Sequence, residues 1–458
     1  MMAATNYRND SLVLGFSNLR QLRSERPLVL ARGKGVFVFD ENGKDYIEAV
    51  SSFYCTALGF SEDELVEAAI KQMRELPFYA SGAHRTVPVV LELADRLAAI
   101  APIPRAKIAF ATTGSEANDH LVKFAWYRNV FAGKPTRRKI VSRRGSYHGG
   151  SIFTTALGGA KDVHDSFAIP MNDSLLVSQP DYRRHRIAGE DEDGFSERLA
   201  RELSDVIEEA GPDSVAAFIA EPLSVSAGMI PPPAGYFARV KQVLDRYGID
   251  MFIDEIVTGF GRTGEFWGSE KFGLAPQAVT AAKGLSGAYQ PISAIIMSED
   301  FYEGVERGSD DTGWFAHAGT YHAHPVAAAV ALKMIEIMQR RDVLGHVRRV
   351  IPLFKRMLDD LAVHPLVAGV RAFGLAGAID AAEPDARGDT APAASQMKVG
   401  GIAKAIYEAG LEAGIILRPL AGTLVLAPPL IITAAEIAEL ERRIRAALDA
   451  VLARPAGA

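Results

Sequence analysis

A lysine surrounded by small residues is the first candidate for chemistry. Lys283 lies in the stretch 279–294, where Ala, Gly and Ser flank it. A solvated surface lysine needs no such clearance, so the pattern indicates a lysine that acts covalently, for example by forming a Schiff base. Upstream, residues 251–257 are typical of a buried strand that ends in the acidic pair Asp254 and Glu255. A buried salt bridge between Lys283 and one of these acids is the alternative interpretation.

A second candidate is an anion site. Residues 107–119 indicate a short strand, then Gly114 and Ser115, then a helix that runs to about Phe131. Backbone N–H groups at a helix start bind anions, and a glycine lets the ligand approach closely. The alternative is an ordinary capped turn in which Ser115 is the helix cap.

Two further segments complete the set. Residues 215–222 indicate a buried strand with Glu221 at its end, and Tyr147 and His148 follow a strand near Ile140. A cofactor with an aldehyde, a phosphate and a pyridine nitrogen would use a lysine, an anion site, an acid at the ring nitrogen and an aromatic ring for stacking. The sequence therefore predicts pyridoxal 5'-phosphate as the cofactor.

A dinucleotide-binding motif is present only in part. Residues 259–264 match G-x-G-x-x-G after a strand, but the residues that follow do not indicate a helix. Gly284 also stands where the motif requires an acid. We therefore reject an NAD-dependent dehydrogenase, the main alternative from another enzyme class.

Composition limits the class of protein. The 458 residues are 48% hydrophobic and 23% charged, which suggests two or three globular domains. A net charge of −6 without a basic cluster argues against nucleic acid as a partner. The single cysteine, Cys55, excludes a disulfide framework within the chain and favours a reducing compartment. No signal peptide or membrane span is indicated, so we expect a cytoplasmic protein; no metal ligands are predicted.

Periodicity predicts the elements around these residues. Residues 1–30 should form a helix or arm, and residues 35–49 a hairpin turning at Asn42 and Gly43. Ser61 and Glu64 indicate a capping box for a helix over 61–76. Alternating strands and helices predict a doubly wound, mostly parallel sheet. The other expected elements are helices over 87–100, 325–340, 345–362, 398–413 and 433–453, strands over 370–380, 415–420 and 423–426, and a loop at 384–394.

Several motifs together resemble one family. The segments 113–118, 147–149, 221–222, 252–264, 281–284, 319–320 and 324–325 resemble the class III aminotransferases of fold type I, in the family's order. The resemblance spans about residues 12–450. It implies an α/β fold with a large cofactor-binding domain over 61–325. A small α+β domain would come from both chain ends, 1–60 and 326–458.

The resemblance also implies residue roles. Lys283 would bond to the cofactor aldehyde, and Asp254 would hold the pyridine nitrogen. The other implied cofactor contacts are Ile256 and Tyr147 on opposite ring faces, Gly114 and Ser115 at the phosphate, Thr320 at the phosphate from a second subunit, Glu221, and His148. We interpret His148 as structural, since the freed Lys283 amine already lies at the reacting carbon. A homodimer with shared sites follows, which could pair further into a tetramer.

Two features resemble the pyruvate-dependent ω-transaminase branch. Arg418 stands where that branch has a mobile arginine for a carboxylate, although a surface arginine is the alternative. Ser226 stands where glutamate-using relatives carry a glutamate. The expected reaction moves an amino group from an amine or ω-amino acid to pyruvate or a similar keto acid by a ping-pong mechanism. A decarboxylase, racemase or aminomutase on the same fold, or a non-catalytic binding module, is the alternative.

The pocket departs from the family pattern. Tyr54 replaces the usual pocket tryptophan, and Gly82, Ala83 and Gly150 stand where close relatives often carry larger residues. Smaller walls imply a wider substrate pocket. Cys55 has no base partner in the sequence and is interpreted as a packed small hydrophobe.

Overall fold

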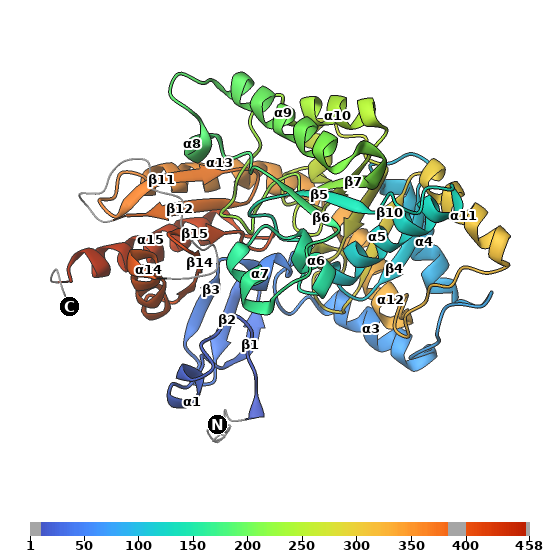
Figure 1. Ribbon diagram of the computed structural model, residues 1–458. Helices are drawn as coiled ribbons and strands as arrows, with labels where there is room; N and C mark the ends of the chain where they lie inside the picture. The colour runs from blue at the N-terminus through green and yellow to red at the C-terminus, as the bar shows by residue number, and fades with distance from the viewer. Residues whose placement is uncertain (1–10, 383–399, 455–458) are drawn as a thin grey trace.

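A seven-stranded sheet forms the centre of the molecule in the computed structural model, which describes residues 11–382 and 400–454 (Figure 1). Its strand order is β4-β10-β9-β8-β7-β5-β6. Only β10 runs antiparallel to its neighbours β4 and β9. The strands are β4 (Lys107–Ala111), β5 (Lys139–Arg143), β6 (Ser174–Val177), β7 (Val215–Ala220), β8 (Asp250–Asp254), β9 (Ala278–Ala281) and β10 (Ser293–Met297). The expected doubly wound, mostly parallel sheet of fold type I is confirmed.

Both faces of this sheet are covered and buried. Successive side chains of a strand point to opposite faces, so they enter two different cores. In β7, Ile219 packs on the face of helix α5, whereas Phe218 and Ala220 join the larger core on the other face. The first face carries α5 (Gly114–Phe131), α6 (Ile152–Leu157) and α11 (Glu299–Thr312). The second core takes in residues of α3 (Asp63–Glu75), α4 (Pro88–Ile100), α9 (Glu192–Ala210), α10 (Tyr236–Tyr247) and α12 (Pro325–Arg340).

Two four-stranded sheets lie beside the central one. The first has the order β1-β2-β3-β13, and the second β11-β12-β15-β14. Their strands are β1 (Leu30–Lys34), β2 (Phe37–Asp40), β3 (Asp45–Glu48), β11 (Val367–Ala372), β12 (Gly377–Ala381), β13 (Ile415–Ile416), β14 (Arg418–Leu420) and β15 (Thr423–Leu426). The parallel pairing of β3 with β13 joins the two chain ends. The domain boundaries at residues 60 and 325 stay a prediction.

Short helices and the C-terminal helices complete the fold. They are α1 (Gln21–Ser24), α2 (Ser51–Tyr54), α7 (Lys161–Phe167), α8 (Tyr182–His185), α13 (Val343–Leu361), α14 (Gly401–Glu412) and α15 (Ala434–Leu452). In Figure 1, α14 and α15 lie beside β14 and β15, away from α3 and α4. The expected helix or arm near the N-terminus is in part the one-turn α1. Residues 1–10 and the loop expected at 384–394 lie outside the described residues.

The structure confirms some local predictions and corrects others. The hairpin forms as expected, with β2 antiparallel to β3 and the Asn42 N–H bonded to Asp40 Oδ1 at 2.9 Å. The capping box at Ser61 was wrong. Ser61 has a φ of 62° and donates its hydroxyl to the Gly33 carbonyl, while Glu64 pairs with Arg340 and Arg341. The single strand expected over 370–380 is two strands, β11 and β12.

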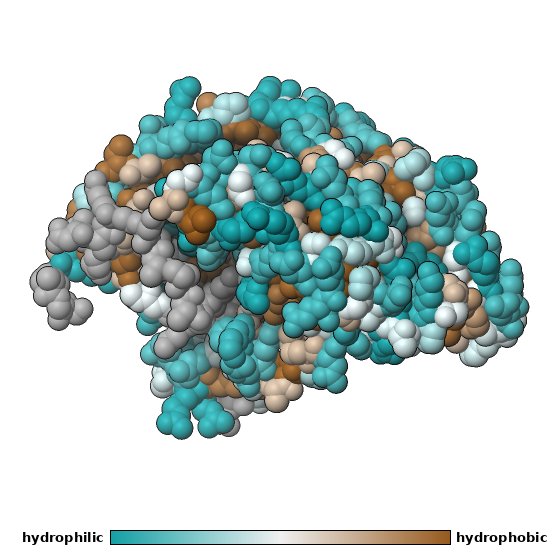
Figure 2. Space-filling view, turned by 45° about the horizontal axis from the view of Figure 1, so that its top comes forward, coloured by the Kyte–Doolittle hydropathy of each residue, from teal (hydrophilic) through white to brown (hydrophobic). Residues whose placement is uncertain are grey.

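The surface is mainly hydrophilic on the face shown in Figure 2, where apolar side chains form small, separate groups. Among the described residues, no helix has both the length and the apolar character needed to cross a membrane. The apolar residues instead fill the cores on the two sides of the sheet.

Candidate active site

The polar side chains predicted from the sequence meet at one edge of the central sheet. Asp254 ends β8, Glu221 follows β7, and Lys283 lies two residues beyond β9. Carboxyl ends of parallel strands share an edge, which is where open α/β sheets bind ligands. The cavity there is lined by eight of the expected residues: Gly114, Ser115, Tyr147, His148, Glu221, Asp254, Ile256 and Lys283.

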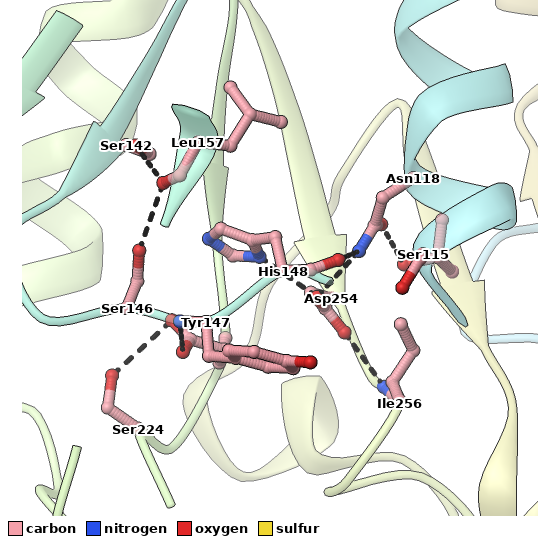
Figure 3. A network of polar contacts seen from close by, with 12 residues as sticks. Ser115, Asn118, Ser142, Ser146, Tyr147, His148, Leu157, Ser224, Asp254 and Ile256 are labelled. Atoms are coloured by element: carbon pink, nitrogen blue, oxygen red, sulfur yellow. Dashed lines mark hydrogen bonds and ion pairs between the residues drawn. The ribbon is translucent and has the colours of Figure 1, made fainter. Parts of the chain in front are cut away.

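Asp254 is held by three donors. It is 4% exposed, and its Oδ2 accepts hydrogen bonds from Asn118 Nδ2 and His148 Nδ1, both at 2.9 Å. The Ile256 N–H donates to Oδ1 at 3.0 Å. Figure 3 shows these side chains converging on the carboxylate from α5, β8 and the loop after β5. The carboxylate is therefore fixed in one orientation toward the cavity.

Asn118 ends the family-like segment 113–118, but no role for it was predicted from the sequence. Thr280 Oγ1 donates to Asn118 Oδ1 at 2.7 Å, so the amide NH₂ must face the other way. That NH₂ donates to Asp254 and to the His148 carbonyl at 2.7 Å. Asn118 thus orients both residues, and its place in that segment was the available signal in the sequence.

Lys283 begins the one-turn helix η4 (Lys283–Leu285) with a φ of 44°. Residues other than glycine rarely adopt this backbone conformation. Its Nζ lies 5.2 Å from the centre of the Tyr54 ring. Within the described part of the chain it has no ion pair, so the salt bridge considered above does not form. Burial lowers the pKa of Lys283, although Cys55 and Asp254 act in the opposite direction. The neutral, nucleophilic amine is thereby favoured.

The other member of the acidic pair has a structural role. Glu255 accepts from the Thr258 hydroxyl and from the N–H groups of Gly268 and Ser269 at 2.9 and 2.6 Å. Residues 259–264 lead into turns and the short helix η3 (Gly268–Phe272) rather than into a helix at the third glycine. These residues therefore do not form a dinucleotide-binding site.

The start of helix α5 forms the floor of the anion site. Thr113, not Ser115, is the cap, because its side chain accepts from the Glu116 N–H at 3.2 Å. Ser115 Oγ instead accepts from the Gly150 N–H at 3.0 Å. A Cβ added to Gly114 would lie 2.6 Å from Ile256 Cδ1, so a larger residue there would push the Ile256 side chain out of its position. The 18-residue helix offers its first N–H groups beside this cavity.

A buried ion pair positions Tyr147. Arg143 at the end of β5 contacts Glu221 Oε2 at 2.6 Å, and Glu221 Oε1 accepts from the Tyr147 N–H at 3.1 Å. Burial alone would raise the pKa of Glu221, but Arg143 and His148 hold it below its usual range. Arg143 was missed in the sequence; an arginine that ends a buried strand was the available signal. The pair fixes the loop that places the Tyr147 ring beside the cavity (Figure 3).

A left-handed turn carries the next group. Residues Ser51–Tyr54 all have φ between 48° and 70°, and Tyr54 is 3% exposed. The guanidinium of Arg418 lies 4.5 Å from the centre of the Phe53 ring and 5.5 Å from that of Tyr54. Its buried Nε has no hydrogen-bond partner in the described structure. Arg418 is therefore a cation that stacks on two aromatic rings and has no ion pair with the residues that the structure describes.

Two expected site residues lie elsewhere in the single chain. Gly82 and Thr320 are exposed and are not among the residues that line the cavity. Gly150 lies at its border, next to the lining residue Gly149. Cys55 Sγ donates to the Phe53 carbonyl, and burial raises the pKa of its thiol, which agrees with a packed, unreactive cysteine.

The observed residues fit the expected cofactor. The unpaired amine of Lys283, the three-donor carboxylate of Asp254 and the glycine-walled helix start match an aldehyde, a pyridine nitrogen and a phosphate. Tyr147 and Ile256 line the same cavity as aromatic and aliphatic side chains.

Comparisons with known proteins identify the family. The family model "Aminotransferase class-III" matches residues 21–448. Gamma-aminobutyrate transaminase 1, mitochondrial, of Oryza sativa subsp. japonica is 37% identical over 95% of this chain and 83% of its own length. A thermostable omega transaminase mutant from Pseudomonas jessenii superposes with a TM-score of 0.93 at 35% identity, covering 98% of this chain and 99% of that one.

A further solved structure bears on the cofactor. The omega transaminase of Pseudomonas jessenii in complex with PMP, the amino form of pyridoxal phosphate, matches with a TM-score of 0.92 at 36% identity and covers 96% of both chains. The family match, the identity and the coverage together leave one conclusion. The chain belongs to the class III aminotransferases, enzymes that use pyridoxal phosphate to move amino groups between small amines and keto acids.

Proposed function

We propose that this enzyme is an ω-transaminase that transfers an amino group from an amine or ω-amino acid to pyruvate or a similar keto acid by a ping-pong mechanism. The observation that carries the proposal is Arg418, whose guanidinium stacks on Phe53 and Tyr54. It pairs with no carboxylate in residues 11–382 and 400–454, and the Tyr54 ring also lies 5.2 Å from Lys283 Nζ. Such a cation can bind the carboxylate of a keto acid. Relatives named gamma-aminobutyrate and omega transaminases support the substrate class.

The residues divide the work at the reacting centre. Pyridoxal phosphate, when bound, supplies an electrophilic carbon and a ring that takes up electrons. The Lys283 amine would hold the cofactor at that carbon, and as a free amine it would move a proton at the substrate carbon. Asp254, oriented by Asn118 and His148, would keep a proton on the ring nitrogen.

The remaining residues bind and orient the cofactor. The N–H groups at Gly114 and Ser115 hold the phosphate, and the Tyr147 and Ile256 side chains confine the ring between them. Glu221 acts through the Tyr147 backbone. His148 serves mainly as a donor to Asp254 rather than as a proton shuttle.

The acceptor preference follows from charge in the cavity. Ser226 lines the cavity and carries no charge, whereas relatives that use glutamate as a substrate carry a glutamate at this position. Glutamate is therefore a less suitable amino partner for this enzyme, and pyruvate a more suitable keto acid. Neutral amines need the same space, so Arg418 must turn away from them, because an unpaired guanidinium against an apolar group is costly.

The complete site requires a second subunit in this proposal. Thr320 and Gly82 are exposed in the single chain, and the family resemblance places Thr320 at the phosphate of the partner. A homodimer, which could pair into a tetramer, would bring these residues to the cavity. The cytoplasmic location expected from the single cysteine stays a prediction, and the plant relatives include mitochondrial and chloroplastic proteins.

A half-reaction tests the reaction type. The holoenzyme is mixed with an amine alone, and cofactor forms are separated and quantified. We expect pyridoxamine phosphate equal to the number of sites, followed by its return to pyridoxal phosphate on addition of pyruvate. Carbon dioxide release, racemised substrate or a migrated amino group without stoichiometric pyridoxamine phosphate would instead show a decarboxylase, racemase or aminomutase.

A lysine variant tests the site. Lys283→Ala should lose both the visible absorbance of the covalently held cofactor and steady-state turnover, whereas Lys71→Ala, at an exposed position on α3, should keep both. Retention of absorbance and turnover in Lys283→Ala would show that another residue bonds to the cofactor.

A further inference from the structure

Three histidines gather outside the active site. His120 lies on α5, and His317 and His322 lie in the segment between α11 and α12. One ring nitrogen from each falls within 4.8 Å of the other two. In residues 11–382 and 400–454 this is the single group of three His, Cys, Asp or Glu side chains with such spacing. We propose that His120, His317 and His322 bind a divalent transition metal ion.

The three imidazole rings are already in contact. The ring centre of His120 lies 4.5 Å from that of His317 and 5.0 Å from that of His322, and both pairs meet edge to face. His120 Nδ1 is buried and has no hydrogen-bond partner among the described residues. A buried nitrogen without a partner is costly, and a metal ion would remove that cost.

Two charged neighbours act in opposite directions. Glu116 Oε1 bonds to His322 Nε2 at 3.0 Å, the kind of carboxylate contact that commonly orients a metal-binding histidine. Lys123 Nζ lies 3.4 Å from His317 Nδ1 and repels a cation there. Metal binding therefore requires the flexible Lys123 side chain to turn away, while Glu116 stays in place.

The ligand set selects the class of metal. Imidazole suits zinc, nickel, cobalt and copper, whereas calcium and magnesium prefer oxygen ligands. Zinc–nitrogen bonds of about 2.0–2.1 Å require the three nitrogens to close to roughly 3.4 Å, which side-chain rotation can supply. A water molecule would complete four-coordination.

The location gives the ion a structural effect. Glu116 and His120 lie on the first two turns of α5, the helix whose start carries Gly114 and Ser115. His317 and His322 flank Thr320. A metal ion shared by these histidines would tie the Thr320 segment to α5, and so fix its position relative to the anion site.

Metal content of the tag-free holoenzyme tests the inference. The enzyme is stripped with a chelator and dialysed against micromolar Zn²⁺, and bound zinc per chain is measured. We expect about one equivalent, a raised Tm, and absorption typical of four-coordinate cobalt when Co²⁺ replaces Zn²⁺. His120→Asn and His322→Asn should each weaken binding by at least roughly tenfold, while His185→Asn, at an exposed position, should not change it.

A charge variant sharpens the test. Lys123→Gln should bind Zn²⁺ more tightly than the wild type because it removes the cation beside His317. Circular dichroism and cofactor content show whether each variant folds. If the wild type binds no more Zn²⁺ than the His120→Asn/His322→Asn double variant, or if Co²⁺ gives only a six-coordinate spectrum, the proposed site is wrong. The wild-type Co²⁺ titration decides the matter even if the variants fail to fold.

Discussion

Asn118 donates a hydrogen bond of 2.9 Å to Asp254 and so joins helix α5 to the end of strand β8. The two residues lie 136 positions apart in the chain. The helix whose first residues line the cavity therefore also orients the Asp254 carboxylate in that cavity.

Removing this amide tests its positioning role. Asn118→Ala would leave Thr280 Oγ1 without its acceptor and Asp254 with two donors instead of three. An unsatisfied buried group costs about 1–3 kcal/mol, which corresponds to a fall in kcat of roughly 5- to 160-fold. The KM for the amine should stay within a few-fold, and the cofactor should remain bound.

Asn129→Ala is the matched control for that experiment. Asn129 lies on the same helix and bonds to the Arg137 carbonyl at 2.8 Å, away from the cavity. Equal losses of kcat in the two variants would show a general effect on helix α5 rather than orientation of Asp254. Asp254→Ala should itself retain some cofactor but lose most of the activity.

Arg418 should act on one substrate only. Arg418→Ala is expected to raise the KM for pyruvate at least roughly tenfold, the loss of a charge-assisted contact of about 1.4 kcal/mol or more. The KM for an amine without a carboxylate should change by no more than a few-fold. Arg74→Ala, on the exposed surface of α3, is the control. Steady-state kinetics with both substrates checks this. If the KM for pyruvate and the KM for the amine rise equally, Arg418 only supports the fold.

Pocket width is best tested at Gly150. A Cβ added there would meet only Tyr147 Oη, at 3.9 Å, so Gly150→Val should fold and narrow the cavity. We expect a loss of activity toward bulky amines with little change toward small ones, measured across an amine series. Gly82 is a poorer test, because its φ of 154° strains any other residue. Uniform activity across the series in Gly150→Val would show that Gly150 does not limit the pocket.

Glu48 should make stability depend on pH. Its buried side chain accepts from the N–H groups of Val50 and Ser52, at the left-handed turn that carries Tyr54. Burial is the main cause that raises the pKa of Glu48 to about 7. Between about pH 4.5 and 7 the folded protein binds a proton that the unfolded chain has lost. The contribution of Glu48 is therefore complete below pH 4.5 and is lost as the pH rises through 7.

Comparison with Glu48→Gln isolates this contribution. The free energy of unfolding is measured by urea titration of both proteins at pH 5 and pH 8. The wild type should lose up to about 3 kcal/mol relative to the variant on going to pH 8, because 2.5 pKa units separate the two states. A difference between the proteins that does not change with pH would contradict a raised pKa for Glu48.

The sequence was enough to propose Lys283 and Asp254 as the groups that act on the cofactor. Lys283 and Asp254 stand at strand ends, and parallel strands bring their carboxyl ends to one edge, so periodicity was enough to place both in one cavity. The hairpin at Asn42 and Gly43 was equally predictable, because a short turn depends mainly on its own residues. The family resemblance supplied the roles of the individual side chains.

Tertiary structure alone decided how these groups are held. The Arg143–Glu221 pair, the orientation of the Asn118 amide and the cluster of His120 with His317 and His322 all join residues that are distant in the sequence. Ser61 met a capping pattern and yet bonds to Gly33, a partner 28 residues away. Hydrogen bonds and ring contacts need atoms placed within fractions of an ångström. Only the packing of helices on both faces of the sheet sets those positions, and no spacing along the chain encodes them.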